Sequence, residues 1–134
     1  MKESQNLLRS SPLLLSVVGF LMTTTIQMVS PVLSLYAYGF LHATIEQVGL
    51  IVSAYFVSSF LSKILLGFTI SPRHSLSAAV LATGAASVAP VSYALAQTPE
   101  VLTLLRVYHG FSLSVSITAL LTVASLMARP GQAE

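Results

Sequence analysis

The segment that decides the fold runs from Val101 to Met127 and reads VLTLLRVYHGFSLSVSITALLTVASLM. It contains one formal charge, on Arg106, and most of its other polar residues are serines and threonines set among aliphatic side chains. A helix needs about 20 mostly apolar residues to cross the hydrocarbon core of a bilayer. The segment is long enough and apolar enough, so it predicts a transmembrane helix.

The rest of the chain has the same character. Of its 134 residues, 54% are hydrophobic and only 7% are charged, against about 25% charged in a typical soluble domain. No formal charge lies between Arg9 and Glu46, or between Arg73 and Glu100. These proportions exclude a soluble globular enzyme, a disordered tail and a nucleic-acid-binding module, since each of those classes needs a charged surface.

Four stretches of the sequence are long enough to cross a bilayer. They predict spans at residues 12–38, 46–70, 75–96 and 101–127. Together they fill nearly the whole chain and leave no room for a soluble domain. We therefore expect an all-α membrane protein with a single transmembrane domain over residues 1–134.

The charges outside these spans predict an orientation. Positive residues lie in the N-terminal segment, in the second loop and in the C-terminal tail: Lys2, Arg9, Arg73 and Arg129. The loops at residues 39–45 and 97–100 contain no Lys or Arg. Because Lys and Arg are in excess in cytoplasmic loops, both termini of this multi-pass protein of the cell membrane are expected in the cytoplasm.

The first expected span carries a polar face. Thr23, Gln27, Ser30 and Ser34 recur at helical spacing and share one side of the helix. A glutamine amide in hydrocarbon needs several hydrogen-bond partners, so this face is expected to meet another helix or a water-filled cavity. The alternative for the hydroxyl groups is a bond to their own backbone, four residues earlier.

Two cations, Lys63 and Arg106, lie inside expected spans. The Lys63 side chain can reach the headgroups along its four-carbon stem, with a place in a cavity as the alternative. Arg106 stays charged, so it has to snorkel, pair with an anion or face water. Small or hydroxylic residues follow it on the same helical face: Gly110, Ser114, Thr118, Thr122 and Ser125. This stripe predicts the wall of a solute pathway, with a structural contact as the other interpretation.

The residues needed for enzymatic chemistry are missing from the sequence. It has no cysteine, and His42, His74 and His109 do not have the spacing of metal ligands. The acids are confined to chain ends and span boundaries: Glu3, Glu46, Glu100 and Glu134. No glycine-rich phosphate-binding loop is present. We therefore expect no enzymatic activity, no cofactor and no metal.

Two segments resemble the major facilitator superfamily of transporters. Residues 47–55, QVGLIVSAY, followed by Gly67 and a basic loop at Arg73, are similar to that family's second span and second loop. The loop signature of the family is G-x-x-x-D-R-x-G-R-R, and here Ser71 stands where an aspartate is expected. Residues 105–110, LRVYHG, are similar to the family's R-x-x-Q-G pattern in the fourth span, with His109 at the glutamine position.

The resemblance covers about residues 12–130 and implies a secondary transporter. It implies that Arg106 is buried and linked to proton coupling, and that Gly67, Ser71, Arg73 and Gly110 occupy motif positions. We expect a pathway for substrate and protons that is lined by polar residues of the first and fourth spans: Arg106, Gln27, Thr23, Ser30, Ser114 and Thr118.

The family builds its transporters from two halves of six spans each, with repeats inside each half. The four spans here resemble the start of the first half, so the remaining transporter helices are expected as partners, together with lipid, a small solute and protons. One alternative is a four-span transporter that works as a homo-oligomer. The first span of such proteins carries a glutamate, and here it has none. Another alternative is a non-transporting membrane protein that assembles with or regulates a larger partner. No nucleic acid is expected to bind.

Overall fold

The computed structural model describes residues 2–69 and 74–127, which form four α-helices and contain no strand. These are α1 (Lys2–Gly39), α2 (Ile45–Thr69), α3 (Ser75–Tyr93) and α4 (Pro99–Met127). Each of the four contains a segment that is long enough and apolar enough to cross a membrane. The prediction of an all-α protein with four helices that could span a membrane is confirmed for the described residues.

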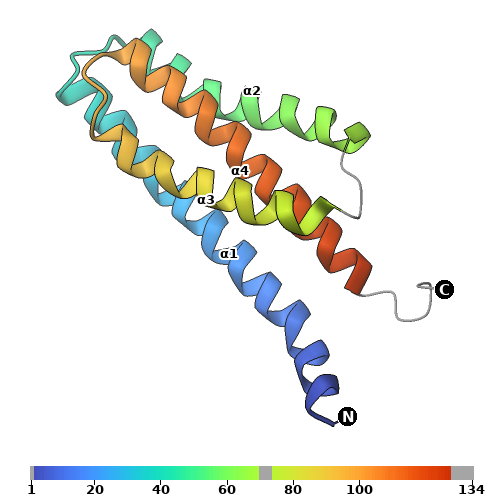
Figure 1. Ribbon diagram of the computed structural model, residues 1–134. Coiled ribbons are helices and arrows are strands. Elements are labelled where there is room, and N and C mark those ends of the chain that lie inside the picture. The colour runs from blue at the N-terminus through green and yellow to red at the C-terminus, as the bar shows by residue number, and fades with distance from the viewer. Residues whose placement is uncertain (1, 70–73, 128–134) are drawn as a thin grey trace.

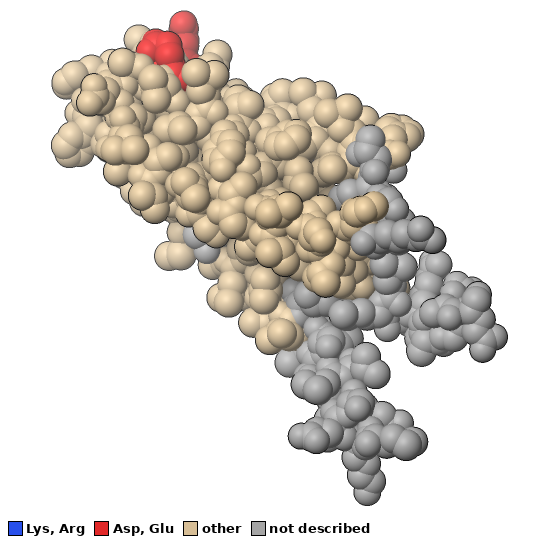
Figure 2. Space-filling model, viewed as in Figure 1, with Lys and Arg blue, Asp and Glu red and all other residues tan. Residues whose placement is uncertain are grey.

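Successive helices run in opposite directions (Figure 1). The α1–α2 and α3–α4 connections lie at one end of the bundle, and the first residues of α1 and the last residues of α4 lie at the other. Glu46 lies in the first turn of α2 and Glu100 in the first turn of α4, and the two line one hollow at this end. Figure 2 shows acidic side chains at this end and at no other described place on the face in view. The two loops without Lys or Arg therefore share one end, as an alternating topology requires.

The helix boundaries differ from the predicted spans by more than two residues at two places. α1 begins at Lys2 rather than at residue 12, because the helix continues through the polar N-terminal segment. α3 ends at Tyr93 rather than at residue 96. The backbone N–H groups of Ala94, Leu95 and Ala96 bond to carbonyl oxygens three residues earlier, a tighter winding that is common where a helix terminates.

The starts of α2 and α4 are encoded locally. The Thr44 hydroxyl accepts a bond from the Gln47 N–H at 3.3 Å, and the Gln47 side chain accepts one from the Thr44 N–H at 2.9 Å. This reciprocal pair is a capping box, which satisfies N–H groups that would otherwise lack a partner. Thr98 caps α4 more weakly, through the Val101 N–H at 3.4 Å.

α4 is the central helix, because it packs against both α2 and α3 along much of their lengths (Figure 1). It approaches α2 closely at Gly110, where an added Cβ would lie 3.2 Å from Tyr55 Cα and collide with the Tyr55 carbonyl group. α3 turns a row of small residues to the inside: Ala79, Ala82, Ala86 and Ala89. Small side chains let helix backbones approach each other in lipid.

α1 is joined to the bundle mainly through its C-terminal part. Leu33 and Ala37 are buried in a cluster with Ile51, Tyr93 and Leu102. The Tyr36 hydroxyl donates to the Ala96 carbonyl oxygen at 3.1 Å, so α1 also holds the turn between α3 and α4. Toward its N-terminus α1 diverges from the other helices (Figure 1).

Candidate functional site

Arg106 lies at the junction of the helices and its side chain is 0% exposed. It stands about 10 Å along α4 from Pro99, at 1.5 Å per residue. Its Nη2 donates to the Ser30 hydroxyl of α1 at 3.0 Å. Its Cζ lies over the ring of Tyr55 in α2, 4.6 Å from the centroid, which is the geometry of a cation–π contact. Residues of α1 and α2 therefore hold the guanidinium that α4 carries.

The charge of Arg106 is not compensated within the described residues. Its Nε and Nη1 are buried and have no hydrogen-bond partner. The described acids whose side chains are placed, Glu46 and Glu100, are exposed at the end of the bundle, where the Gln47 amide donates to Glu100 at 3.4 Å. A buried ion costs several kcal/mol unless an opposite charge or hydrogen bonds offset that cost. This site therefore presents free hydrogen-bond donors and an uncompensated positive charge.

Three aromatic side chains surround the guanidinium. The Tyr93 hydroxyl and His109 Nδ1 share a hydrogen bond of 2.5 Å, and the rings of Tyr55 and Tyr93 each lie 5.7 Å from the His109 ring. The Tyr93 hydroxyl lies near the guanidinium as well. All three side chains are buried. We call Arg106, Ser30, Tyr55, Tyr93 and His109 the Arg106 cluster.

The cluster includes part of the polar face predicted on the first span. Ser30 belongs to it, whereas Gln27 and Thr23 are exposed in this structure. Thr23 bonds to the Gly19 carbonyl oxygen at 2.9 Å, four residues earlier, which is the alternative considered for it. Ser34 bonds in the same way to the Ser30 carbonyl oxygen at 3.1 Å. Only one of these four residues therefore contacts the buried charge.

Two residues of the stripe on α4, Gly110 and Ser114, contact α2. Ser114 is buried and donates to the Ser59 carbonyl oxygen at 2.9 Å. Thr118 is half-buried, and its carbonyl oxygen accepts the Thr122 hydroxyl at 2.9 Å. Gly110, a motif position, makes the close approach to Tyr55 described above.

The remaining motif positions lie far from the cluster or outside the described part of the chain. Gly67 belongs to the last turns of α2, at the opposite end of that helix from Glu46. Ser71 and Arg73 lie outside the described residues. Lys63 is exposed on α2.

Sequence reasoning assigned no role to Tyr55 or Tyr93 in this site. Both lie in predicted spans, where tyrosine is a polar residue that needs a hydrogen-bond partner when buried. That signal marks them as candidates, yet it does not say which partner they meet. His109 was placed only through the motif, and its contact with Tyr93 depends on how α3 packs on α4.

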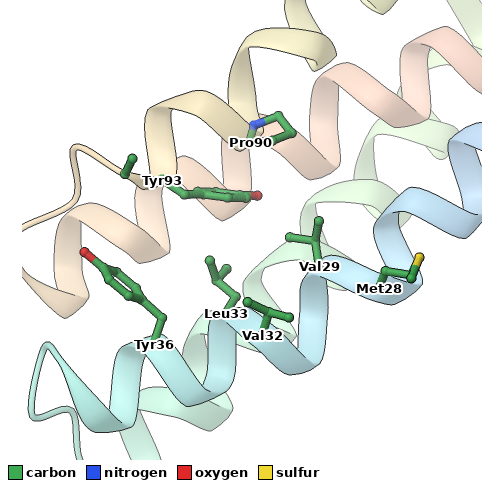
Figure 3. A pocket seen from close by; sticks show the side chains of 8 residues that line it. Met28, Val29, Val32, Leu33, Tyr36, Pro90 and Tyr93 are labelled. Carbon is green, nitrogen blue, oxygen red and sulfur yellow. The ribbon is translucent and has the colours of Figure 1, made fainter.

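A cleft lies beside the cluster, between α1 and α3, with a volume of about 520 Å³. Figure 3 shows Met28, Val29, Val32, Leu33 and Tyr36 of α1 on one side and Pro90 and Tyr93 of α3 on the other. A second hollow of about 380 Å³ separates the N-terminal part of α1 from α4. In the described part of the chain, no group of three or more histidine or acidic side chains is arranged to hold a metal ion.

No protein-family model, curated protein or solved structure matches the chain.

Proposed function

We propose that the chain belongs to a membrane transport protein and that the Arg106 cluster lies on its solute pathway. The observation that carries the proposal is the burial of a permanently charged guanidinium, with unpartnered nitrogen atoms, among four helices that could span a bilayer. Ionisable residues within membrane spans are costly and mark ion or substrate pathways by default. A purely structural arginine would be expected to have its donors satisfied.

The transporter type we propose is that of the major facilitator superfamily. The sequence motifs favour it, with Arg106 in the position where that family has a buried arginine. In this proposal the four helices correspond to the start of the amino-terminal six-helix bundle, with both termini in the cytoplasm. The path would lie beside α1 and α4, and alternating access would come from rocking of two halves around a central site.

Two experiments test the proposal. Membrane vesicles from cells that express the native gene are assayed for uptake of a panel of labelled monocarboxylates, amines and sugars, with and without an imposed pH gradient. We expect uptake of at least one solute that the substitution Arg106→Gln abolishes and Lys63→Gln leaves intact. Membrane levels of each variant are measured in parallel.

The outcomes separate the candidate functions. Absence of uptake for every solute, with the protein present in the membrane, contradicts a transport function and favours an assembly or regulatory role. Uptake by the purified 134-residue chain alone, reconstituted in liposomes, contradicts the six-helix assignment and favours a homo-oligomer of four-helix chains. Normal uptake by the Arg106→Gln variant would contradict the proposal that the Arg106 cluster lies on the solute pathway.

A further inference from the structure

The cleft between α1 and α3 is almost entirely apolar. Its α1 wall runs from Met28 to Tyr36, about 12 Å along the helix at 1.5 Å per residue. The volume, about 520 Å³, lies within the range of small-ligand pockets, about 300–1,000 Å³. The cleft is therefore large enough for a single flexible apolar chain.

The charged guanidinium of Arg106 lies at the same height along the helices as this cleft, behind the side chains that line it. Ser30, which bonds to Arg106, follows the cleft residue Val29 on α1. On α3, Tyr93 lines the cleft and also belongs to the Arg106 cluster. Leu33 and Tyr93 pack in one apolar cluster and complete the wall. An apolar cleft and a buried cation with free donors are thus separated by one layer of side chains.

We propose that the cleft and the Arg106 cluster form one binding site for an amphipathic monocarboxylate with a single acyl chain. The chain lies in the cleft and the carboxylate binds the guanidinium. This inference rests on the proposed function and names the substrate class of the same site. Each fork of the guanidinium pairs Nη2 with one of the two nitrogens that lack a partner, so the carboxylate adds charge-assisted hydrogen bonds where none exist.

The packing of α1 allows the carboxylate to reach Arg106. One hydrogen bond, Arg106 Nη2 to Ser30, links α1 to the guanidinium, and α1 contacts α4 far less than α2 and α3 do. A small outward movement of α1, or a rotation of Tyr93, opens the wall between cleft and charge. The charge-assisted bonds formed with the carboxylate are stronger than the neutral contacts given up.

The test is equilibrium binding of radiolabelled decanoate to the full chain in phosphatidylcholine nanodiscs, with empty nanodiscs subtracted. We expect saturable binding that unlabelled decanoate displaces and that decanol, of equal chain length, displaces at least ten-fold more weakly. Arg106→Gln is expected to weaken binding at least ten-fold. Lys63→Gln, which removes an exposed cation within a span, is expected to leave it unchanged.

A second pair of variants tests the acyl-chain part of the site without touching the charge. Val32 lines the cleft and is 65% exposed, so Val32→Phe adds bulk to the cleft without disturbing the core. We expect it to lower decanoate affinity at least five-fold. Leu35→Phe changes an exposed residue of α1 outside the cleft and is expected to have no effect. Circular dichroism checks that each variant is folded.

Several results would overturn the inference. One is binding of decanol as tight as that of decanoate, and another is unchanged decanoate affinity in Arg106→Gln. The third is no saturable binding by the folded chain, which would indicate that a carboxylate of another helix pairs with Arg106. Displacement by phosphatidic acid ten-fold more strongly than by decanoate would assign the site to a lipid phosphate. Decanoate binding without any solute uptake would contradict the proposed function alone, and uptake of another solute without decanoate binding would contradict this inference alone.

Discussion

α4 and α1 are alike in sequence and differ in their surroundings. Both are long apolar helices with hydroxylic residues recurring along one face. In the most apolar window of α4, 39% of the residues are buried inside the protein, against 6% in α1. Some hydroxyl groups of α4 and its neighbours bond between helices, such as Ser58 to the Val107 carbonyl oxygen at 2.6 Å, and others, such as Thr122, bond to their own backbone. Hydroxyl groups of α1, such as those of Thr23 and Ser34, donate to their own backbone.

This difference shows that a polar stripe does not by itself mark a packed face. Every hydroxyl group in hydrocarbon needs a partner, and the carbonyl four residues earlier is always within reach. A neighbouring helix provides another partner only where the backbones approach closely. At α4 that approach occurs at Gly110, and four predictions follow from the contrast.

The largest effect is expected where α4 meets α2. Gly110→Leu places a side chain against the Tyr55 backbone, which cannot move aside without separating the helices. We expect a loss of about 3 kcal/mol, the upper part of the usual range for overpacking. Unfolding in mixed micelles by increasing dodecyl sulfate, followed by circular dichroism, measures it. Gly49→Leu is the matched control, because a Cβ at Gly49 meets nothing within 4 Å; equal losses would contradict the close approach.

The next effect tests the attached part of α1. Leu33 is 6% exposed and Leu35 is 73% exposed, although they are two residues apart on the same helix. Leu33→Ala is expected to destabilise the fold by about 2 kcal/mol through lost contacts and a cavity. Leu35→Ala is expected to change stability by less than about 0.5 kcal/mol, as at other exposed positions. Similar losses of stability for the two variants in the same unfolding assay would mean that Leu33 does not pack α1 against the other helices.

A gain in stability is expected at Arg106. Replacing a buried charge by an apolar side chain of similar length removes the desolvation cost, and replacement of buried ion pairs by apolar residues often stabilises a protein by about 1–4 kcal/mol. We expect Arg106→Met to raise the free energy of unfolding by about 1–2 kcal/mol while abolishing uptake in the vesicle assay. Lys63→Met, at an exposed position, serves as the control. Destabilisation by Arg106→Met would indicate that the charge is satisfied in the folded protein.

The smallest expected effect on stability distinguishes hydrogen bonds that serine hydroxyl groups form between helices from those that they form within one helix. Ser58→Ala removes the bond from α2 to the Val107 carbonyl oxygen of α4, and Ser34→Ala removes a bond within α1. Hydrogen bonds between membrane helices are worth about 0.6 kcal/mol on average. We expect a loss near that value for Ser58→Ala and a smaller one for Ser34→Ala. Replicate unfolding curves resolve the difference, and a larger loss for Ser34→Ala would reverse the contrast.

Parts of the fold and site could be predicted because they depend on local properties. The Thr44–Gln47 capping box joins residues three apart in the chain, and each of the four apolar helices is one continuous stretch of sequence. The burial of Arg106 was also expected from the sequence, and the structure shows it. From the sequence Gln27 looked equivalent to Ser30, and the structure exposes Gln27 and places Ser30 against the guanidinium.

The sequence by itself determined that the chain suits an apolar environment and where its helices lie. The free energy of transferring residues from water to hydrocarbon adds up along the chain, whatever their neighbours in space. The tertiary structure alone decided which polar residues meet. In lipid, the rotation and separation of helices depend on how closely their backbones pack, here through Gly110 and the alanines of α3. That packing brought Ser30, Tyr55, Tyr93 and His109 around Arg106 and left two guanidinium nitrogens without a partner.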